Sequence, residues 1–214
     1  LGHPAGQCRH PAPATHPHQR GLGEQPCETD VLSRSYLPSE LIKACSMELA
    51  AELPMVNWAL LSDVIKASTD FLDSIIDVSE YPIPQIDKMV RTTRKVGLGM
   101  MGFADLLIML KLPYGSHKSE LLAELISRFI TGEARAKSAE LALSRGPFPA
   151  FEGSAFDSPD KPKMRNATVT TVAPTGTISM IANASSGCEP LFGDAFTKDR
   201  KSTRLNSSHI TISY

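Results

Sequence analysis

Hydrophobic residues recur at three- and four-residue steps between residues 57 and 78, in the stretch "NWALLSDVIKASTDFLDSIIDV". This spacing gathers them on one side of an α-helix and predicts an amphipathic helix. Asn57 stands directly before the pattern and is a preferred N-cap residue. "YPIP" at 81–84 ends the helix, because a residue before proline disfavours the helical conformation. The apolar positions are Trp58, Leu61, Val64, Ile65, Phe71, Leu72, Ile75 and Ile76.

Three further helices are predicted downstream. "PQIDKMVRTTRK" (84–95) opens with Pro84 at the first helical position and is basic near its end, as the helix dipole favours. "GFADLLIMLKL" (102–112) is nearly all apolar, which predicts a buried helix. A long helix is predicted from Ser119 to about Arg145, where Gly146 and Pro147 stop it.

One segment predicts a β-strand. Residues 147–165 are rich in Pro, Gly, Ser and charge, which is typical of a surface loop. "ATVTTVA" at 167–173 follows, and its β-branched residues favour an extended conformation. Several predicted helices followed by one predicted strand indicate an α/β fold whose other strands lie outside this chain.

Composition narrows the classes of partner. The 214 residues suffice for one domain or for a piece of a larger one. The 22 basic and 23 acidic residues give a net charge of −1, which argues against nucleic acid or an anionic membrane as partner. The longest apolar runs are too short to span a bilayer, and the first residues lack the features of a signal peptide. A cytoplasmic protein is expected.

The cysteines indicate no metal site. Cys8, Cys27, Cys45 and Cys188 show no CxxC spacing, so neither a zinc site nor a dense disulfide framework is predicted. A redox role for one or two of these cysteines is left as an alternative.

Both ends are predicted to lie outside the functional domain, which is expected at residues 21–198. Residues 199–214, "DRKSTRLNSSHITISY", have no periodicity, and their back-translation resembles a widely used sequencing-adapter oligonucleotide. We interpret them as an artefactual tail. Residues 1–20 crowd His and Pro, as expected for disordered polypeptide or a GC-rich gene translated out of frame. A His-rich metal tract is the alternative, but no histidine pair lies on a helical pattern.

"GLGMMG" at 97–102 has the formal GxGxxG spacing of a dinucleotide site. That motif needs a strand directly before it and an acidic residue about twenty positions later at the end of a second strand. Here a predicted helix precedes the glycines, and the acids at that distance fall inside another helix. We therefore interpret Gly97, Gly99 and Gly102 as a tight passage between helices with close backbone packing.

"APTGTIS" at 173–179 follows the predicted strand and precedes a short predicted helix. It lacks the lysine of a nucleoside-triphosphate P-loop. Free backbone N–H groups in such a turn suit an anion, Gly176 permits close approach, and Thr175 and Thr177 add hydroxyl donors. The alternative is an ordinary capped turn, which the spacing alone slightly favours.

Three stretches together resemble the catalytic subunit of ribonucleotide reductases. They are "FLDSIIDVSEYPIPQI" (71–86), "RKVGLGMMGFADLLIMLKLPYGS" (94–116) and "RNATVTTVAPTGTISMIANASSGCEPLF" (165–192). They are most similar to the adenosylcobalamin-dependent class II enzymes, where GLGxMGxADLL and APTGTIS…SSGxEP occur in this order and at about this spacing. The resemblance covers roughly residues 57–196.

The resemblance implies a fold and a reaction. The fold is a ten-stranded α/β barrel, of which this chain holds a helix-rich fragment. The reaction is reduction of ribonucleoside diphosphates to 2′-deoxyribonucleoside diphosphates by thiyl-radical chemistry, with adenosylcobalamin as cofactor and a thioredoxin-like reductant. The full-length enzyme is expected in the cytoplasm, with a homodimer as one possible state, and the fragment is expected to be inactive alone.

The resemblance also assigns site residues by motif. Pro174, Thr175, Gly176, Thr177 and Ile178 match the turn that binds the substrate diphosphate. "SSGCEP" (185–190) matches SSGxEP, with a cysteine where an aliphatic residue is usual. We interpret that cysteine as a small buried substitute without a redox role.

"GEQP" at 23–26 resembles the end of the family's NPCGEQP loop, which puts Glu24 at the general-base position. In that register Leu22 occupies the position of the radical cysteine, and Arg20 that of the asparagine. Leucine has no S–H group, so the chain as written cannot start the chemistry. We interpret this as a frame or assembly error.

Two alternatives to the class II function stay open. One is the large subunit of an oxygen-dependent class I ribonucleotide reductase. The other is a non-catalytic helical binding or scaffold module, in which the 174–178 turn is only a helix cap.

Overall fold

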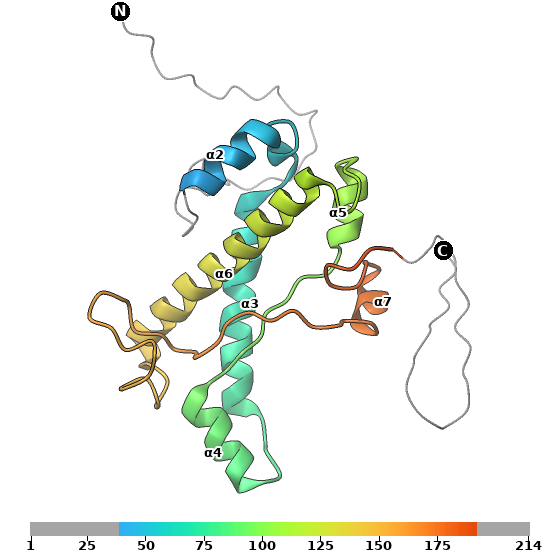
Figure 1. Ribbon diagram of the computed structural model, residues 1–214. Helices are drawn as coiled ribbons and strands as arrows, with labels where there is room; N and C mark the ends of the chain where they lie inside the picture. The colour runs from blue at the N-terminus through green and yellow to red at the C-terminus, as the bar shows by residue number, and fades with distance from the viewer. Residues whose placement is uncertain (1–38, 192–214) are drawn as a thin grey trace, which may run out of the picture.

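The computed structural model describes residues 39–191, which are mainly helical (Figure 1). The two longest helices, α3 and α6, pack against each other; α2 contacts α6, and α4 contacts α3. None of the described helices is long and apolar enough to cross a membrane. The elements are α2 (Ser39–Glu48), the short 3-10 helix η1 (Leu53–Met55), α3 (Trp58–Val78), α4 (Pro84–Thr93), α5 (Phe103–Met109), α6 (His117–Arg145) and α7 (Ile178–Ala182).

The predicted helix boundaries are largely confirmed. Asn57 caps α3, its side-chain oxygen accepting from the Leu60 N–H at 3.0 Å, and Pro84 opens α4. Helix α6 begins two residues earlier than predicted because Ser116 caps it, and it ends before Gly146, whose φ is 80°. Helix α2 was not predicted. The sequence feature that could have indicated it is the four-residue spacing of Leu41, Cys45 and Leu49, which are all buried.

The predicted apolar side of α3 is only partly the buried side. Trp58, Ile65 and Ile76 are buried, but Val64 and Phe71 are 52% and 66% exposed. The side that packs on α6 also carries Ser62, Thr69 and Asp73. Ser62 and Asp73 can occupy this side because partners on other elements satisfy them, contacts that apolar spacing does not reveal, whereas the Thr69 hydroxyl donates to the Ile65 carbonyl within α3.

Helix α5 is shorter and less buried than predicted. Phe103 and Leu107 are buried, whereas Ile108 and Met109 are 61% and 72% exposed. The expectation of full burial is therefore wrong for the described structure, since described residues pack against only one side of this helix.

The predicted strand at 167–173 is also corrected: residues 39–191 contain no regular strand. The segment instead runs parallel to residues 94–98 through an isolated bridge between Leu98 and Thr170. Leu98 N–H donates to the Val169 carbonyl at 2.9 Å, and Thr171 N–H donates to the Leu98 carbonyl at 3.0 Å. The α/β prediction is therefore seen here only as a helix-rich piece, without a regular strand or a barrel among residues 39–191.

Close backbone packing around the glycines at 97–102 is confirmed. A methyl group on Gly97 would lie 2.8 Å from the Thr171 side chain, and one on Gly99 would lie 3.1 Å from the Thr171 carbonyl oxygen. Gly102 has a φ of 81° where α5 begins. The glycines thus allow two backbone segments to lie side by side, as interpreted from the sequence.

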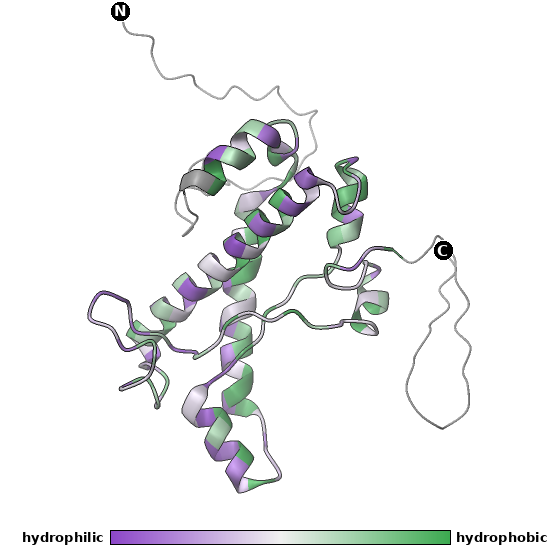
Figure 2. Ribbon diagram, in the orientation of Figure 1, coloured by the Kyte–Doolittle hydropathy of each residue, from purple (hydrophilic) through white to green (hydrophobic). Residues whose placement is uncertain are grey.

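The hydrophobic core lies between α2, α3, α5 and α6. Trp58 and Phe129 meet edge-to-face with ring centroids 5.1 Å apart, and the indole N–H of Trp58 donates to the Leu53 carbonyl at 3.1 Å. Figure 2 shows hydrophobic and hydrophilic bands alternating along α6, as expected for a helix with one buried side. Other core residues include Leu49, Leu107, Leu122, Leu125, Ile126 and Val169.

A fully buried carboxylate, Asp73, joins four segments. Arg94 donates to one oxygen of Asp73 at 2.8 and 3.0 Å, and Asn166 donates to the same oxygen at 2.9 Å. The other oxygen accepts from Arg145 at 3.2 Å and from Arg165 at 3.4 Å. These contacts connect α3 with the end of α4, the end of α6 and the segment entering residues 167–173.

Arg94 balances this buried charge. It lies in the left-handed conformation at φ 45° and also contacts Asp77 at 2.7 Å. Burial opposes the charge of Arg94, but hydrogen bonds to Asp77 and Asp73 outweigh it and raise the pKa of Arg94. Hydrogen bonding from Arg94 in turn lowers the pKa of Asp77. These two shifts favour the charged forms of Arg94 and Asp77.

Replacing the central carboxylate should destabilise the chain strongly. Asp73→Ala would remove the fully buried partner of the Arg94 guanidinium and leave it only the half-exposed Asp77, a loss of about 3–5 kcal/mol. Urea unfolding followed by circular dichroism measures it. The matched control is Glu124→Gln, which breaks an exposed ion pair with Arg128 and should cost less than about 1 kcal/mol. Equal effects of the two substitutions would contradict the central role of Asp73.

Two glycines should respond differently to the same added methyl group. Gly97→Ala forces the methyl against Thr171 and should cost about 1–3 kcal/mol. Gly176→Ala meets nothing within 4 Å, so its effect on unfolding should stay within about 0.5 kcal/mol. The same urea titration compares both variants with the unsubstituted chain.

Candidate functional site

The turn at 174–178 connects the 167–173 segment with α7, and most of it is exposed. Thr175 has a φ of 51°, in the left-handed region that residues other than glycine rarely adopt. Among the described residues, the N–H groups of Gly176, Thr177 and Ile178 have no hydrogen-bond acceptor. The turn therefore presents three consecutive free amides.

The two threonine hydroxyls differ in their surroundings. The Thr175 hydroxyl is half-buried and accepts from the Gly187 N–H at 2.8 Å. Thr177 is exposed. The hydroxyl of Thr177 is thus open to a ligand, whereas that of Thr175 already faces the 185–190 loop.

Serine residues bind the turn to that loop. The Ser179 N–H donates to the Thr175 carbonyl at 2.9 Å. The hydroxyl groups of Ser179 and Ser186 lie 3.0 Å apart. The "APTGTIS" and "SSGCEP" motifs are therefore two halves of one structural unit.

Asp105 attaches this unit to the start of α5. One carboxylate oxygen accepts from the Ser185 N–H at 2.6 Å, and the Asp105 N–H donates to the Ser185 hydroxyl at 3.4 Å. Gly102 N–H donates to the Ser185 carbonyl at 2.8 Å. The "GFADLL" stretch thus contacts the loop 80 residues later in the sequence. Sequence reasoning did not single out Asp105 or Ser179, and it named Ser185 only as a position of the SSGxEP motif.

The donors at this site are neutral. Residues 166–191 contain no Lys, Arg or His. An anion in the turn would thus be held by amides and hydroxyls, as the sequence suggested. Within residues 39–191 no three His, Cys, Asp or Glu side chains cluster as metal ligands would.

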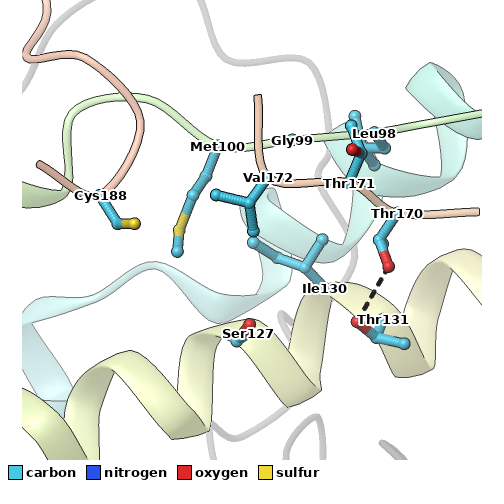
Figure 3. A pocket seen from close by; sticks show the side chains of 10 residues that line it. All are labelled: Leu98, Gly99, Met100, Ser127, Ile130, Thr131, Thr170, Thr171, Val172 and Cys188. Carbon is cyan, nitrogen blue, oxygen red and sulfur yellow. Dashed lines mark hydrogen bonds between the residues drawn. The ribbon is translucent and has the colours of Figure 1, made fainter. Parts of the chain in front are cut away.

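A pocket of about 310 Å³ lies between the paired segments and α6 (Figure 3). Met100, Val172 and Ile130 give it an apolar lining, and the hydroxyls of Thr131 and Thr170 lie 3.4 Å apart at one side. Cys188 borders the other side. The pocket is thus lined by both paired segments, by Cys188 of the 185–190 loop and by α6, and it lies directly before the turn in the sequence.

The cysteines inside the described residues do not form a pair. Cys188 is half-buried and packs against the core, so the expectation of a small buried substitute holds only in part. Cys45 is fully buried, and burial together with Glu124 and Glu48 raises the pKa of its thiol. Both cysteines are free. Cys8 and Cys27, like Glu24 and Leu22, lie outside the described residues.

The sequence matches the family described as "Ribonucleotide reductase, barrel domain" over residues 41–162 and 160–213. The "Vitamin B12-dependent ribonucleoside-diphosphate reductase" of Thermoplasma acidophilum is 46% identical over 143 residues, 67% of this chain and 18% of the relative. A protein of the same name from Mycobacterium tuberculosis is 46% identical over 164 residues, 76% of this chain and 23% of the relative. The "Ribonucleoside-diphosphate reductase subunit alpha" of Chlamydia pneumoniae is 29% identical over 178 residues, 66% of this chain and 17% of the relative.

The chain thus spans roughly a fifth of the length of the B12-dependent relatives. The second family match reaches residue 213, and the interpretation of 199–214 as an adapter stays a prediction. The two matches together cover more than half of the chain and include all three stretches that carried the resemblance. The chain belongs to the ribonucleotide reductase barrel-domain family.

Proposed function

We propose that this chain is a fragment of an enzyme that reduces ribonucleoside diphosphates to 2′-deoxyribonucleoside diphosphates by thiyl-radical chemistry. In this proposal the turn at 174–178 holds the substrate diphosphate. The observation that carries it is the set of three free amides at Gly176, Thr177 and Ile178, in the motif that the family resemblance assigns to phosphate. The paired segments 94–98 and 167–171 would belong to the barrel, whose other strands lie outside the described residues.

The chemistry of the turn suits a phosphate group. Backbone N–H groups bind phosphate oxygens directly, and Gly176 has no side chain to block their approach. Helix α7 has only five residues, so its dipole adds little, and the amides and the Thr177 hydroxyl make the contacts. Neutral donors leave the diphosphate its charge, which keeps release of the product possible.

The vitamin B12-dependent class is favoured by the comparisons. The two relatives with that name are 46% identical to this chain, whereas the reductase subunit alpha from Chlamydia pneumoniae is 29% identical. The oxygen-dependent large subunit therefore remains the second candidate. The family match disfavours a purely structural helical module.

Two pockets among residues 39–191 have volumes of about 310 and 560 Å³, which suit drug-sized ligands, and neither could enclose adenosylcobalamin, which is much larger. The proposal thus assigns the cofactor to parts of the full-length enzyme outside residues 39–191. It supplies the radical there, and the roles of the turn do not depend on it.

The remaining roles rest on the family resemblance. Glu24 is proposed as the general base on the 3′ hydroxyl, and the position of Leu22 as that of the radical cysteine. A thioredoxin-like protein is proposed as reductant, and a homodimer and a cytoplasmic location are proposed for the full-length enzyme. Because Leu22 has no S–H group, the chain as written should show no turnover.

Nucleoside diphosphate should perturb the turn. Titrated into the ¹⁵N-labelled chain, cytidine diphosphate is expected to shift the amide signals of residues 175–178, because these amides donate to its phosphates. Gly176→Ala, which adds a methyl group at the approach but meets no protein atom, should weaken binding by about tenfold. Cytidine without phosphate is the ligand control. Unmoved signals at 175–178 would favour the turn as a simple helix cap.

The gene should resolve the N-terminal departure. If the chain derives from an active reductase, the flanking genomic DNA should encode NPCGEQP in frame across residues 20–26 and should continue the family sequence after Lys198. Resequencing this region from genomic DNA checks both. A genuine leucine codon at position 22 would remove the catalytic part of the proposal while leaving the phosphate turn untouched.

A further inference from the structure

We propose that Asp105 is a positioning residue for the phosphate turn, acting through the 185–187 segment. This inference rests on the proposed function of the turn and adds to it a residue that does not itself touch the substrate. Asp105 lies in the first turn of α5, far along the chain from residues 174–178.

Two hydrogen bonds, connected by the backbone of residues 185–187, join Asp105 to the turn. Its carboxylate accepts from Ser185 N–H at 2.6 Å, and two residues later Gly187 N–H donates to the Thr175 hydroxyl at 2.8 Å. In parallel, the Ser186 and Ser179 hydroxyls lie 3.0 Å apart, and Ser179 N–H donates to the Thr175 carbonyl. Thr175 is thus held through both its side chain and its backbone.

Thr175 needs this support. Its φ of 51° is unfavourable for a β-branched residue and persists only where surrounding contacts enforce it. The three residues that follow Thr175, namely Gly176, Thr177 and Ile178, carry the N–H groups without an acceptor among the described residues. If the loop moved away, Thr175 could relax to a commoner conformation, and the arrangement of these three amides would change.

The loop can lie this close because of its glycine. Gly187 has a φ of 46°, and a methyl group there would lie 3.3 Å from the Ala173 carbonyl oxygen and 3.8 Å from the Thr175 hydroxyl. On its other side, Ser185 is buried and held at both its N–H and its carbonyl. Asp105 and Gly102 therefore fix one end of a short segment whose other end fixes Thr175.

Asp105 is suited to this role rather than to ligand contact. As an acid in the first turn of α5 it is favoured by the free amides there. Its carboxylate would repel a phosphate, so it acts best through the intervening loop. The two threonines of the motif therefore have different roles in this proposal. Thr177 contacts the ligand, and the Thr175 hydroxyl supports the turn.

The test measures binding of inorganic pyrophosphate and cytidine diphosphate to the full 214-residue chain by ¹⁵N NMR. Asp105→Ala should weaken both by about two- to tenfold, the effect of losing one hydrogen bond. Asp105→Asn retains a side-chain acceptor and should recover most of the affinity. Asp87→Ala removes a matched first-turn acid on α4 and should leave affinity unchanged.

Hydrogen exchange of the ligand-free chain supplies a second readout. Asp105→Ala should speed exchange of the Ser185 and Gly187 amides, while amides in α4 keep their rates. Should Asp105→Ala fail to fold, Ser186→Ala, which removes only the hydroxyl contact with Ser179, should still weaken pyrophosphate binding.

The outcomes separate the two proposals. Unchanged affinity in folded Asp105→Ala, or in Ser186→Ala if the former does not fold, overturns the positioning role and leaves the phosphate turn intact. No binding by the unsubstituted chain overturns the turn itself, and with it the positioning role. Equal weakening of ligand binding by Asp105→Ala and Asp87→Ala also overturns the positioning role, because the loss of affinity would then not be specific to Asp105.

Discussion

The buried carboxylate of Asp73 is the constraint on which the rest of the structure depends. A fully buried charge is unfavourable unless it is paired and hydrogen-bonded, and here Arg94, Arg145, Arg165 and Asn166 all donate to it. Each of these donors comes from a segment that must reach α3 for the charge to be satisfied. The network therefore brings Arg94 and Asn166 together at the starts of the two paired segments. Gly97 and Gly99 then let these two segments lie close together. The pairing of 167–171 with 94–98 in turn positions the turn at 174–178, which follows in the sequence.

The family motifs thus have physical roles beyond the site itself. "FLDSIIDV", "RKVGLG" and "RNATV" supply the buried ion network, whereas "GFADLL", "APTGTIS" and "SSGCEP" supply the contacts among α5, the turn and the loop. One group of contacts is charged and deep, and the other is neutral and close to the surface. If the turn binds a diphosphate as proposed, this arrangement separates stability from ligand contact. The charged network lies away from the turn, and the donors at the turn are amides and hydroxyls.

The sequence predicted the elements that depend on local rules. Asn57, Pro84 and Gly146 marked helix boundaries correctly, because capping and proline effects act within a few residues. The turn at 174–178 was also placed correctly between an extended segment and a short helix. Burial was predicted less well, since the burial of Asp73 and Ser62 depends on partners from distant segments. The strand at 167–173 failed for a related reason: β propensity is local, but a ladder requires neighbours, and residues 39–191 provide only one short partner.

The exposed apolar side of α3 follows from the same reasoning. Phe71 and Val78 are 66% and 79% exposed, and Leu60 and Val64 are 59% and 52% exposed at helical spacing on the same helix. A helix with apolar residues on the side away from its described partner is typical of one enclosed by a larger protein. The chain spans 18% and 23% of its B12-dependent relatives, so most of the family's polypeptide is available to cover this side. The polar side of α3 is already complete, because the Asp73 network is satisfied within the chain. Within residues 39–191, the side of α3 that carries Leu60, Val64, Phe71 and Val78 lacks apolar contact, which the remainder of a longer protein would contribute.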